Sequence, residues 1–310
     1  MPITLFKRRA LAGDTSGRWV VCLFTVLLTL FVVVGAGLVA WWQTPTGRTA
    51  LMPLALFVAG PPEVTMAEAV PGEEAKSVEV PDTSCYAALL KAYVDENGFV
   101  DYQALAKDAD ATAGLDAYIA SLADTPLDKL TRDQHLATLI NAYNAFTLRL
   151  ILDHRPLDSI YDIPESKRWK AKRWVVGGKT VSLDSLEHEW IRPNFREPRV
   201  HWALVCAAYS CPRLLNEPYV AETLENQFEA QAANVHQDKR FFYFKGDVLY
   251  LTELYSWFAG DFEQVDGSTL KHAARYSPRL AKLLDEGRPP KVRAIPYDWS
   301  LNAKRLHATK

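Results

Sequence analysis

The sequence has no excess of positive charge. Its 310 residues include 35 lysine and arginine residues against 37 aspartate and glutamate residues, which gives a formal net charge of -2 at pH 7. Proteins that bind nucleic acids neutralise backbone phosphates with a surplus of basic side chains. The composition therefore argues against a nucleic acid as the main partner.

Sequence signatures of cofactor and metal enzymes are also missing. The chain contains no GxGxxG or Walker-type glycine loop, no CxxC pair, no HExxH helix and no visible internal repeat. These patterns mark dinucleotide, phosphate and zinc sites, so we expect no cofactor. Apolar residues make up 49% of the chain, which is enough for one sizeable core plus an extension.

One long uncharged run is present near the N-terminus. Residues 1–18 are polar and basic, whereas residues 19–42 carry no charge and have Trp19 and Trp42 at their ends. Such a run crosses a hydrocarbon core of about 30 Å, and tryptophan favours membrane interfaces. We predict an uncleaved signal anchor, with a cleaved signal peptide as the alternative. The basic flank predicts a cytoplasmic N-terminus and an extracytoplasmic C-terminal domain, periplasmic in a bacterium.

Residues 43–82 are rich in proline and contain one short apolar island at residues 51–59. This composition predicts a mostly extended tether. Residues 83–310 then form the globular domain. Its patterns predict helices at about 84–93, 110–122, 132–153, 221–236, 254–262, 270–276 and 278–285, hairpins at 172–183 and 241–251, and a last strand at 291–296. Helices mixed with antiparallel hairpins, without a βαβ rhythm, indicate an α+β fold.

Reactive side chains concentrate between residues 181 and 216. The first part predicts a short helix that Ser182 or Asp184 caps and Pro193 ends. Glu187 falls within the apolar stripe of this helix, and His188 lies on its flank, four residues before Arg192. A carboxylate in that position needs a partner. Two interpretations account for Glu187 in this position: a structural ion pair with an arginine, or a role in an active site.

Residues 200–208 form an apolar run that contains His201 and suits a buried strand leading into a turn at 207–210. Cys206 lies at the far end of this run. A buried cysteine is usually a small hydrophobic residue, but a nearby imidazole can lower the pKa of its thiol and make it a nucleophile. Cys211 precedes Pro212 and would cap a helical turn if one began there.

Other states of these thiols fit the sequence as well. In an oxidising compartment, Cys206 and Cys211 could form a disulfide across the turn, which would make the motif structural. A metal held by His188, His201, Cys206 and Cys211 is a third interpretation.

Two asparagines lie inside the predicted helix at 132–153. Asn141 and Asn144 share one face of this helix, and asparagine is a poor helix former. They either hydrogen-bond a loop or line a pocket beside a catalytic histidine.

Four motifs, in this order, resemble the DUF547 family, a domain of unknown function: LINAYNAFTLRLILDH, SLDSLEHEWIRP, RVHWALVCAAYSCP and IPYDWSLN. The resemblance covers residues 131–302 and implies a mixed α/β domain, proposed to be distantly similar to papain-like or transglutaminase-like thiol folds. Carried over by position, the family's Glu-His pair falls on Glu187 and His188, its arginine on Arg192, and its cysteines on Cys206 and Cys211. Plant-type members have Ser-Pro at Cys211-Pro212, which favours Cys206 as the nucleophile.

These patterns predict a thiol-dependent hydrolase or acyl transferase that acts on a small molecule or a peptide. Cys206 would attack an acyl carbon, His188 would take its proton, and Asn141 or Asn144 would orient the imidazole. Glu187 would pair with Arg192 or the substrate. The alternative is a membrane-tethered binding or scaffold domain in which these polar groups only hold the core.

Overall fold

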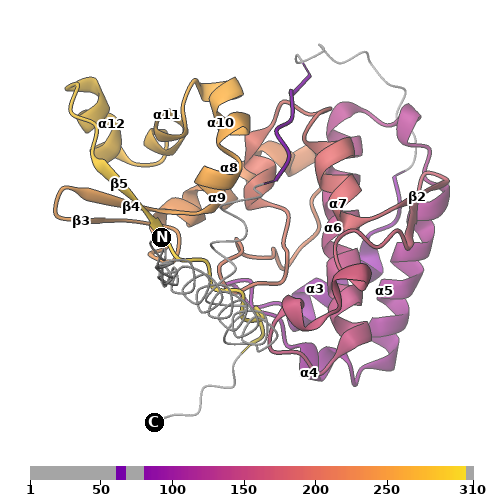
Figure 1. Cartoon of the computed structure of the whole chain (residues 1–310). Helices are drawn as coiled ribbons and strands as arrows, with labels where there is room; N and C mark the ends of the chain where they lie inside the picture. Colours follow the sequence, from indigo (N-terminus) through magenta and orange to yellow (C-terminus); the bar gives the residue numbers. More distant parts are fainter. Residues whose placement is uncertain (1–60, 68–79, 305–310) are drawn as a thin grey trace, which may run out of the picture. The chain divides into compact units, whose positions relative to one another are not determined.

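The longest helix of the domain is α6, Arg132–His154, and it forms where the sequence predicts it. Its first turn is closed by a capping box: the Thr131 side chain accepts from the Gln134 N–H at 3.2 Å, and Gln134 accepts from the Thr131 N–H at 3.0 Å. Helices α3, Ser84–Tyr93, and α5, Ala109–Ser121, pack with α6 in one helical group (Figure 1). This group carries one part of the hydrophobic core.

The structure is a computed structural model that describes residues 61–67 and 80–304, all within the compact unit Met52–Lys310. The predicted membrane anchor at residues 19–42, the basic residues before it and most of the predicted tether lie outside the described residues. Within the described ranges, no helix is both long and apolar enough to cross a membrane.

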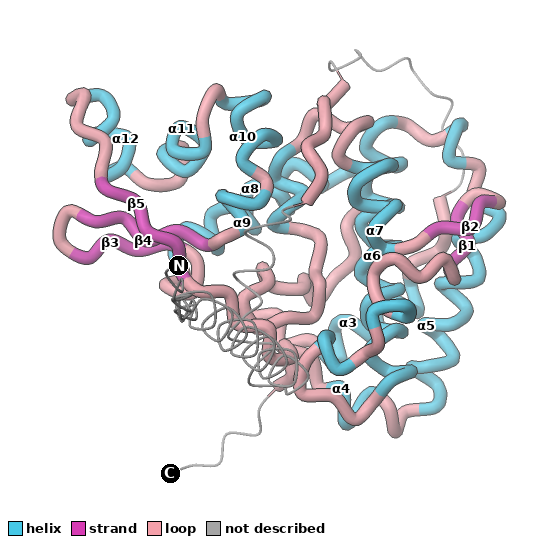
Figure 2. Tube along the Cα trace, viewed as in Figure 1, coloured by secondary structure: helices cyan, strands magenta, loops and turns pink. Residues whose placement is uncertain are grey.

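In the part of the chain that the structure describes, two small sheets accompany the helices (Figure 2). Strands β1, Trp174–Val176, and β2, Lys179–Val181, form the first predicted hairpin around Gly177 and Gly178, which both adopt positive φ. The second predicted hairpin consists of β3, Phe242–Lys245, and β4, Val248–Thr252. The predicted last strand, β5, Lys291–Ile295, is added in parallel to β4. The predicted α+β class is therefore confirmed.

Further helices connect these parts, and most of them match the predicted ranges. The α-helices are α4, Tyr102–Leu105; α8, Leu224–Gln237; α9, Leu254–Trp257; α10, Ala259–Asp266; α11, Thr269–Ala274; and α12, Pro278–Asp285. Single 3-10 turns are found at Leu122–Asp124, Leu127–Lys129, Ile160–Asp162, Glu165–Lys167 and Ala221–Thr223.

The predicted strand at residues 200–208 is wrong. The run begins in a 3-10 helix, η6, Pro198–Trp202, and continues as irregular chain to the predicted turn. Side chains replace a neighbouring strand as hydrogen-bond partners: Asn144 Nδ2 donates to Ala203 O at 3.0 Å and Asn144 Oδ1 accepts from Val205 N at 2.9 Å. Buried main-chain groups need partners of some kind, and here amide side chains supply them.

The predicted helix around Glu187 is present but is not a regular α-helix. It starts with α7, Leu183–Ser185, capped by Ser182, and continues as a π-helix, η5, Leu186–Ile191. The Arg192 N–H donates to Glu187 O at 3.0 Å, which is an i to i-5 hydrogen bond. Such widened turns are rare and often occur at functional sites.

Candidate functional site

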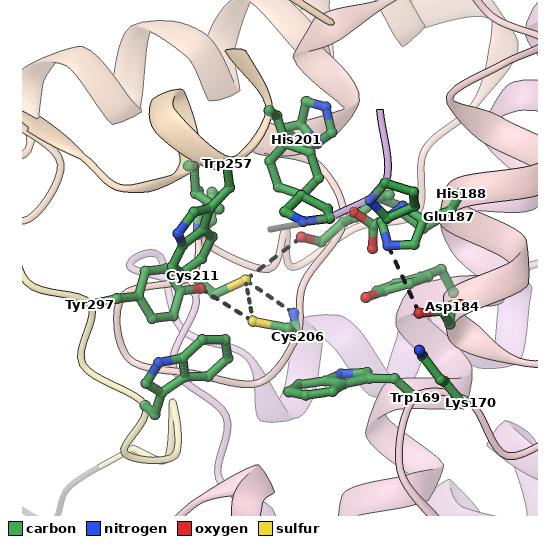
Figure 3. A pocket seen from close by; sticks show the side chains of 18 of the residues that line it. Trp169, Lys170, Asp184, Glu187, His188, His201, Cys206, Cys211, Trp257 and Tyr297 are labelled. Atoms are coloured by element: carbon green, nitrogen blue, oxygen red, sulfur yellow. Dashed lines mark hydrogen bonds and ion pairs between the residues drawn. The ribbon is translucent and has the colours of Figure 1, made fainter. Parts of the chain in front are cut away.

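A cavity of about 380 Å³ lies between η5, the turn after Cys206 and the C-terminal segment. Figure 3 shows the Cys206 and Cys211 sulfurs between aromatic side chains on one side and polar side chains on the other. The aromatic residues that line the cavity are Tyr161, Trp169, Trp257, Tyr297 and Trp299; Trp257 and Tyr297 lie on one side of the sulfurs in Figure 3, whereas Trp169 lies beside Lys170. The polar residues that line it include Glu165, Lys170, Asp184, Glu187 and His188. The predicted Glu187, His188, His201, Cys206 and Cys211 thus all line one cavity.

The Cys206 thiol is partly exposed and is surrounded by hydrogen-bonding groups. Its sulfur is 3.2 Å from Cys211 Sγ and 3.3 Å from Tyr297 Oη. The pKa of the Cys206 thiol is lowered, chiefly because Cys211 can donate to the thiolate, with Tyr297 and the Ala208 N–H as further donors. Burial and the Glu187 charge act in the opposite direction but do not outweigh these donors.

A tight turn places the Ala208 N–H near this sulfur. Ala207 has φ of 63°, in the left-handed region that residues with a Cβ rarely adopt. The C-terminal segment holds the turn, because the Asn302 N–H donates to Ala207 O at 2.9 Å and Ala208 forms an isolated bridge with Leu301. Strained residues of this kind are found at active sites when the surrounding structure maintains them.

Cys211 is the buried member of the thiol pair, with 5% of its surface exposed. Its sulfur accepts from the Cys206 N–H at 3.0 Å. Its one S–H proton has two acceptors within reach, Leu204 O at 3.6 Å and Cys206 Sγ at 3.2 Å, and it turns to Cys206 when that thiol is ionised. Burial, together with the neighbouring Cys206, raises the pKa of this thiol well above its ordinary value, so Cys211 remains protonated. The predicted helix cap at Cys211 is wrong, since residues 212–215 are irregular chain.

The three cysteines among the described residues, Cys85, Cys206 and Cys211, are free thiols. Across residues 61–67 and 80–304, no group of three or more histidine, cysteine, aspartate and glutamate side chains is arranged to hold a metal ion.

His188 is fixed by Arg192 on the next turn of the helix. Arg192 Nη1 lies 2.9 Å from His188 Nδ1, and a guanidinium can only donate, so Nδ1 accepts and the proton of the neutral ring is on Nε2. His188 Nε2 is 4.0 Å from Asp184 Oδ1. The four-residue spacing of His188 and Arg192 thus brings the two side chains into contact, and Nδ1 is free to act as a base only when this contact is broken.

Glu187 has a partner that the sequence did not indicate. The phenol of Tyr143, on α6, is buried and interacts with the Glu187 carboxylate. Burial raises the pKa of Tyr143 well above its usual value, and the Glu187 charge adds to the effect. Glu187 therefore lies beside a protonated phenol at the edge of the cavity, rather than forming the expected ion pair with Arg192.

Arg192 instead forms a buried ion pair with Asp261 on α10. Arg192 Nε donates to Asp261 Oδ2 at 2.7 Å and Nη2 to Oδ1 at 3.0 Å, while His201 Nε2 donates to Oδ2 at 2.8 Å. Burial would raise the pKa of Asp261, but the hydrogen bonds from His201 and Arg192 outweigh it and lower the pKa to about 2. Burial lowers the pKa of His201, which stacks on Phe258 at 3.7 Å between ring centres.

The two asparagines of α6 are buried, and neither lines the thiol cavity. Asn144 holds the main chain that leads to Cys206, as described above. Asn141 donates to Tyr219 O at 2.7 Å and accepts from Tyr219 N at 2.9 Å. Each asparagine thus donates to and accepts from the main chain of a loop. This agrees with the first interpretation of these two residues, in which they hydrogen-bond a loop.

Sequence reasoning missed Tyr143, Asp261 and Tyr297 as members of this site. Tyr297 lies within the IPYDWSLN motif, so its position in a shared motif was an available signal. Tyr143 belongs to the apolar stripe of α6, and its hydroxyl is the only hint of a polar contact. Asp261 is 69 residues from Arg192 in sequence, and no local pattern connects the two.

The fold and the site define a class: an α+β domain with a hydrogen-bonded pair of thiols at an aromatic cavity. Residues 127–234 match the model of the family described as "Protein of unknown function, DUF547". This segment is similar to that family, as the first three motifs predict, and the match includes Glu187, His188, Arg192, Cys206 and Cys211. Comparisons with curated proteins and with solved structures found no match.

Proposed function

We propose that the domain is a thiol-dependent hydrolase or acyl transferase with Cys206 as its nucleophile. The observation that supports this most directly is the environment of one atom: Cys206 Sγ faces a cavity and has Cys211, Tyr297 and the Ala208 N–H as donors to its ionised form. A thiolate, not a thiol, is the attacking species in such chemistry. Hydrogen bonds to the anion therefore serve the purpose that an adjacent base serves in other thiol enzymes.

In the proposed reaction, the Cys206 proton passes to His188 and the thiolate attacks an acyl carbon. A carbon–sulfur bond forms, the bond between the acyl carbon and the leaving group breaks, and the leaving group takes the proton from His188. Water then hydrolyses the thioester, or a second nucleophile takes the acyl group. His188 keeps its predicted role as proton acceptor. That role requires the hydrogen bond from Arg192 to open, because it occupies the Nδ1 lone pair.

Alkylation of Cys206 tests this proposal. We expect iodoacetamide to modify Cys206 at pH 7 faster than a free cysteine, whose thiol has a pKa of about 8.5. The rate should follow an ionisation below that value, because the pKa of Cys206 is lowered. Mass spectrometry of proteolytic peptides from the reduced, alkylated chain distinguishes Cys206 from the exposed Cys85, which serves as an internal reference.

The same measurement on His188→Ala tests the histidine. A slower rate at pH 7 than in the parent supports His188 as the proton acceptor, and equal rates remove it from the mechanism. If Cys206 reacts no faster than Cys85 between pH 6 and pH 8, both in the parent and in variants in which residues 61–67 are released from the cavity mouth, the nucleophile proposal is wrong.

A non-catalytic binding or scaffold domain is the second candidate. It is favoured by the Arg192 contacts, since one side chain joins Asp261, His188 and the main chain of Pro62. A cluster in which every polar group is engaged by another is what a structural role requires. In this case Cys206 would be unreactive until the domain unfolds.

We also propose that residues 19–42 anchor the chain in a membrane with the domain on the extracytoplasmic side. The support is the uncharged length of this run, its terminal tryptophans and the basic residues before it. A reporter that is active only outside the cytoplasm, fused after Lys310, should be active. Activity of a cytoplasmic reporter at the same position, together with silence of the first, reverses the orientation.

A further inference from the structure

Residues 61–67 lie against the domain beside the thiol cavity, far in sequence from the residues that they contact. In Figure 1 this segment is the indigo stretch between α10 and the α6–α7 region, and in Figure 3 its violet ribbon passes close to His188. Pro61 and Pro62 line the thiol cavity itself. The segment thus forms part of the cavity mouth.

The domain holds this segment through its main chain. Gln264, on α10, accepts from the Met66 N–H at 2.9 Å and donates from Nε2 to Val64 O at 2.8 Å. Arg192 Nη1 donates to Pro62 O at 3.0 Å. The groups involved belong to residues 62, 64 and 66, so every second residue turns the same edge toward the domain, as in an extended strand.

Main-chain recognition of this kind does not depend on the sequence of the bound segment. A glutamine side chain presents one donor and one acceptor, which is what the edge of an extended peptide requires. Only one side chain of the segment is deeply buried: Met66 is 4% exposed, whereas Pro62, Glu63, Thr65 and Ala67 are exposed. The Ala67 N–H makes one further contact, to Pro193 O at 2.8 Å.

The groove is also larger than its occupant. A second hollow, of about 630 Å³, runs along residues 61–65 and is bounded by Arg192, Trp257 and Gln264. Trp257 lines both this hollow and the thiol cavity. The hollow along residues 61–65 therefore lies next to the thiol cavity, and the few hydrogen bonds that hold the segment are made beside it.

We propose that the groove along Arg192, Pro193 and Gln264 is a binding site for an extended polypeptide. Residues 61–67 are its intramolecular occupant, and they restrict access to Cys206 until a peptide substrate displaces them. In naming a substrate class, this inference rests on the proposed function. The peptide-binding part of it is independent of whether Cys206 is acidic.

Release of the segment tests the proposal in the full-length chain. Met66→Glu removes the buried anchor, and Gln264→Leu removes two main-chain hydrogen bonds, each worth about a fivefold factor in closure. We expect both variants to increase the alkylation rate of Cys206 about tenfold or more at pH 8.5. Thr65→Glu is the matched control, because Thr65 is exposed, and should leave the rate unchanged.

A peptide added in trans provides the second measurement. An acetylated and amidated Pro-Pro-Glu-Val-Thr-Met-Ala peptide should slow alkylation again in Met66→Glu, where Gln264 is intact, and should have no effect in Gln264→Leu. Equal rates in the parent and both release variants, or no effect of the peptide on Met66→Glu, overturn the proposal. If Cys206 reacts in none of the chains, the proposed function fails. In that case, fluorescence anisotropy measures whether the labelled peptide binds to Met66→Glu, independently of any reaction at Cys206. Absence of binding overturns the proposal that the groove binds a peptide.

Discussion

Replacement of Asp261 by asparagine should lower the free energy of unfolding by about 3–5 kcal/mol, the usual cost of breaking a buried ion pair on one side. The Arg192 and Asp261 side chains are 2% and 1% exposed, and their hydrogen bonds are 2.7 and 3.0 Å long. Asparagine keeps the shape of aspartate but leaves the Arg192 charge buried without a counter-charge. Urea unfolding followed by circular dichroism measures the difference.

A double variant separates the charge from the packing. Arg192→Met with Asp261→Leu removes both charges and should recover a large part of the lost stability, because an apolar pair of similar volume often replaces a buried ion pair without loss. A loss below about 1 kcal/mol in Asp261→Asn, within the range of an ordinary hydrogen bond, contradicts the assignment.

The same carboxylate predicts a dependence of stability on pH. Its folded pKa is lowered to about 2, below the value of about 3.9 for an unfolded chain. A depressed carboxylate pKa gives a stabilisation that is fully present above about pH 4 and is lost as the pH falls towards 2. In Asp261→Asn this part of the acid sensitivity should be absent.

Replacement of Cys211 by alanine should slow the alkylation of Cys206 at pH 7 by about tenfold or more. Hydrogen bonds to charged groups contribute about 1.5–3 kcal/mol, and about 1.4 kcal/mol corresponds to a factor of ten. Cys211 is the largest cause of the lowered pKa of Cys206, so its loss should move that pKa upward. Rates measured from pH 6 to pH 10 separate a shifted pKa from a change in access, because only the former disappears at high pH.

Cys211→Ser is the matched control for this experiment. Serine keeps a donor at the same position and should retain most of the reactivity that alanine loses. Tyr297→Phe removes the second donor, at 3.3 Å from Cys206 Sγ, and should have a smaller effect in the same direction. Unchanged rates at pH 7 in Cys211→Ala would falsify the assignment of Cys211 as the main donor.

The helices of this domain could be predicted because their signals are local. The capping box of Thr131 and Gln134 and the glycine pair between β1 and β2 each lie within a few residues of the structure that they specify. The thiol cavity could be predicted only in part. His188, Cys206 and Cys211 are brought to one cavity as expected, but the further donors at Cys206 come from Tyr297 and from the backbone of a turn.

The wrong strand at residues 200–208 shows why the remainder could not be predicted. An apolar run indicates that a segment is buried, but it does not indicate which groups form hydrogen bonds with the N–H and C=O groups of its main chain. Here Asn144 satisfies Ala203 and Val205, and Gln231 donates to Trp202 O at 3.0 Å. These partners lie up to 61 residues away, and only the folded chain brings them together.

The π-helix at Leu186–Ile191 has a consequence for comparing related chains. A widened turn holds one residue more than an α-helical turn, so each side chain after it is rotated by about 100° relative to an uninterrupted helix. The directions of Glu187 and His188 relative to Arg192 depend on this extra residue. A relative with one residue fewer between Ser182 and Pro193 would keep the same amino acids in its motif yet present a different set of them to the cavity. The number of residues in this helix, as well as their identity, is therefore a criterion for deciding which relatives share the site.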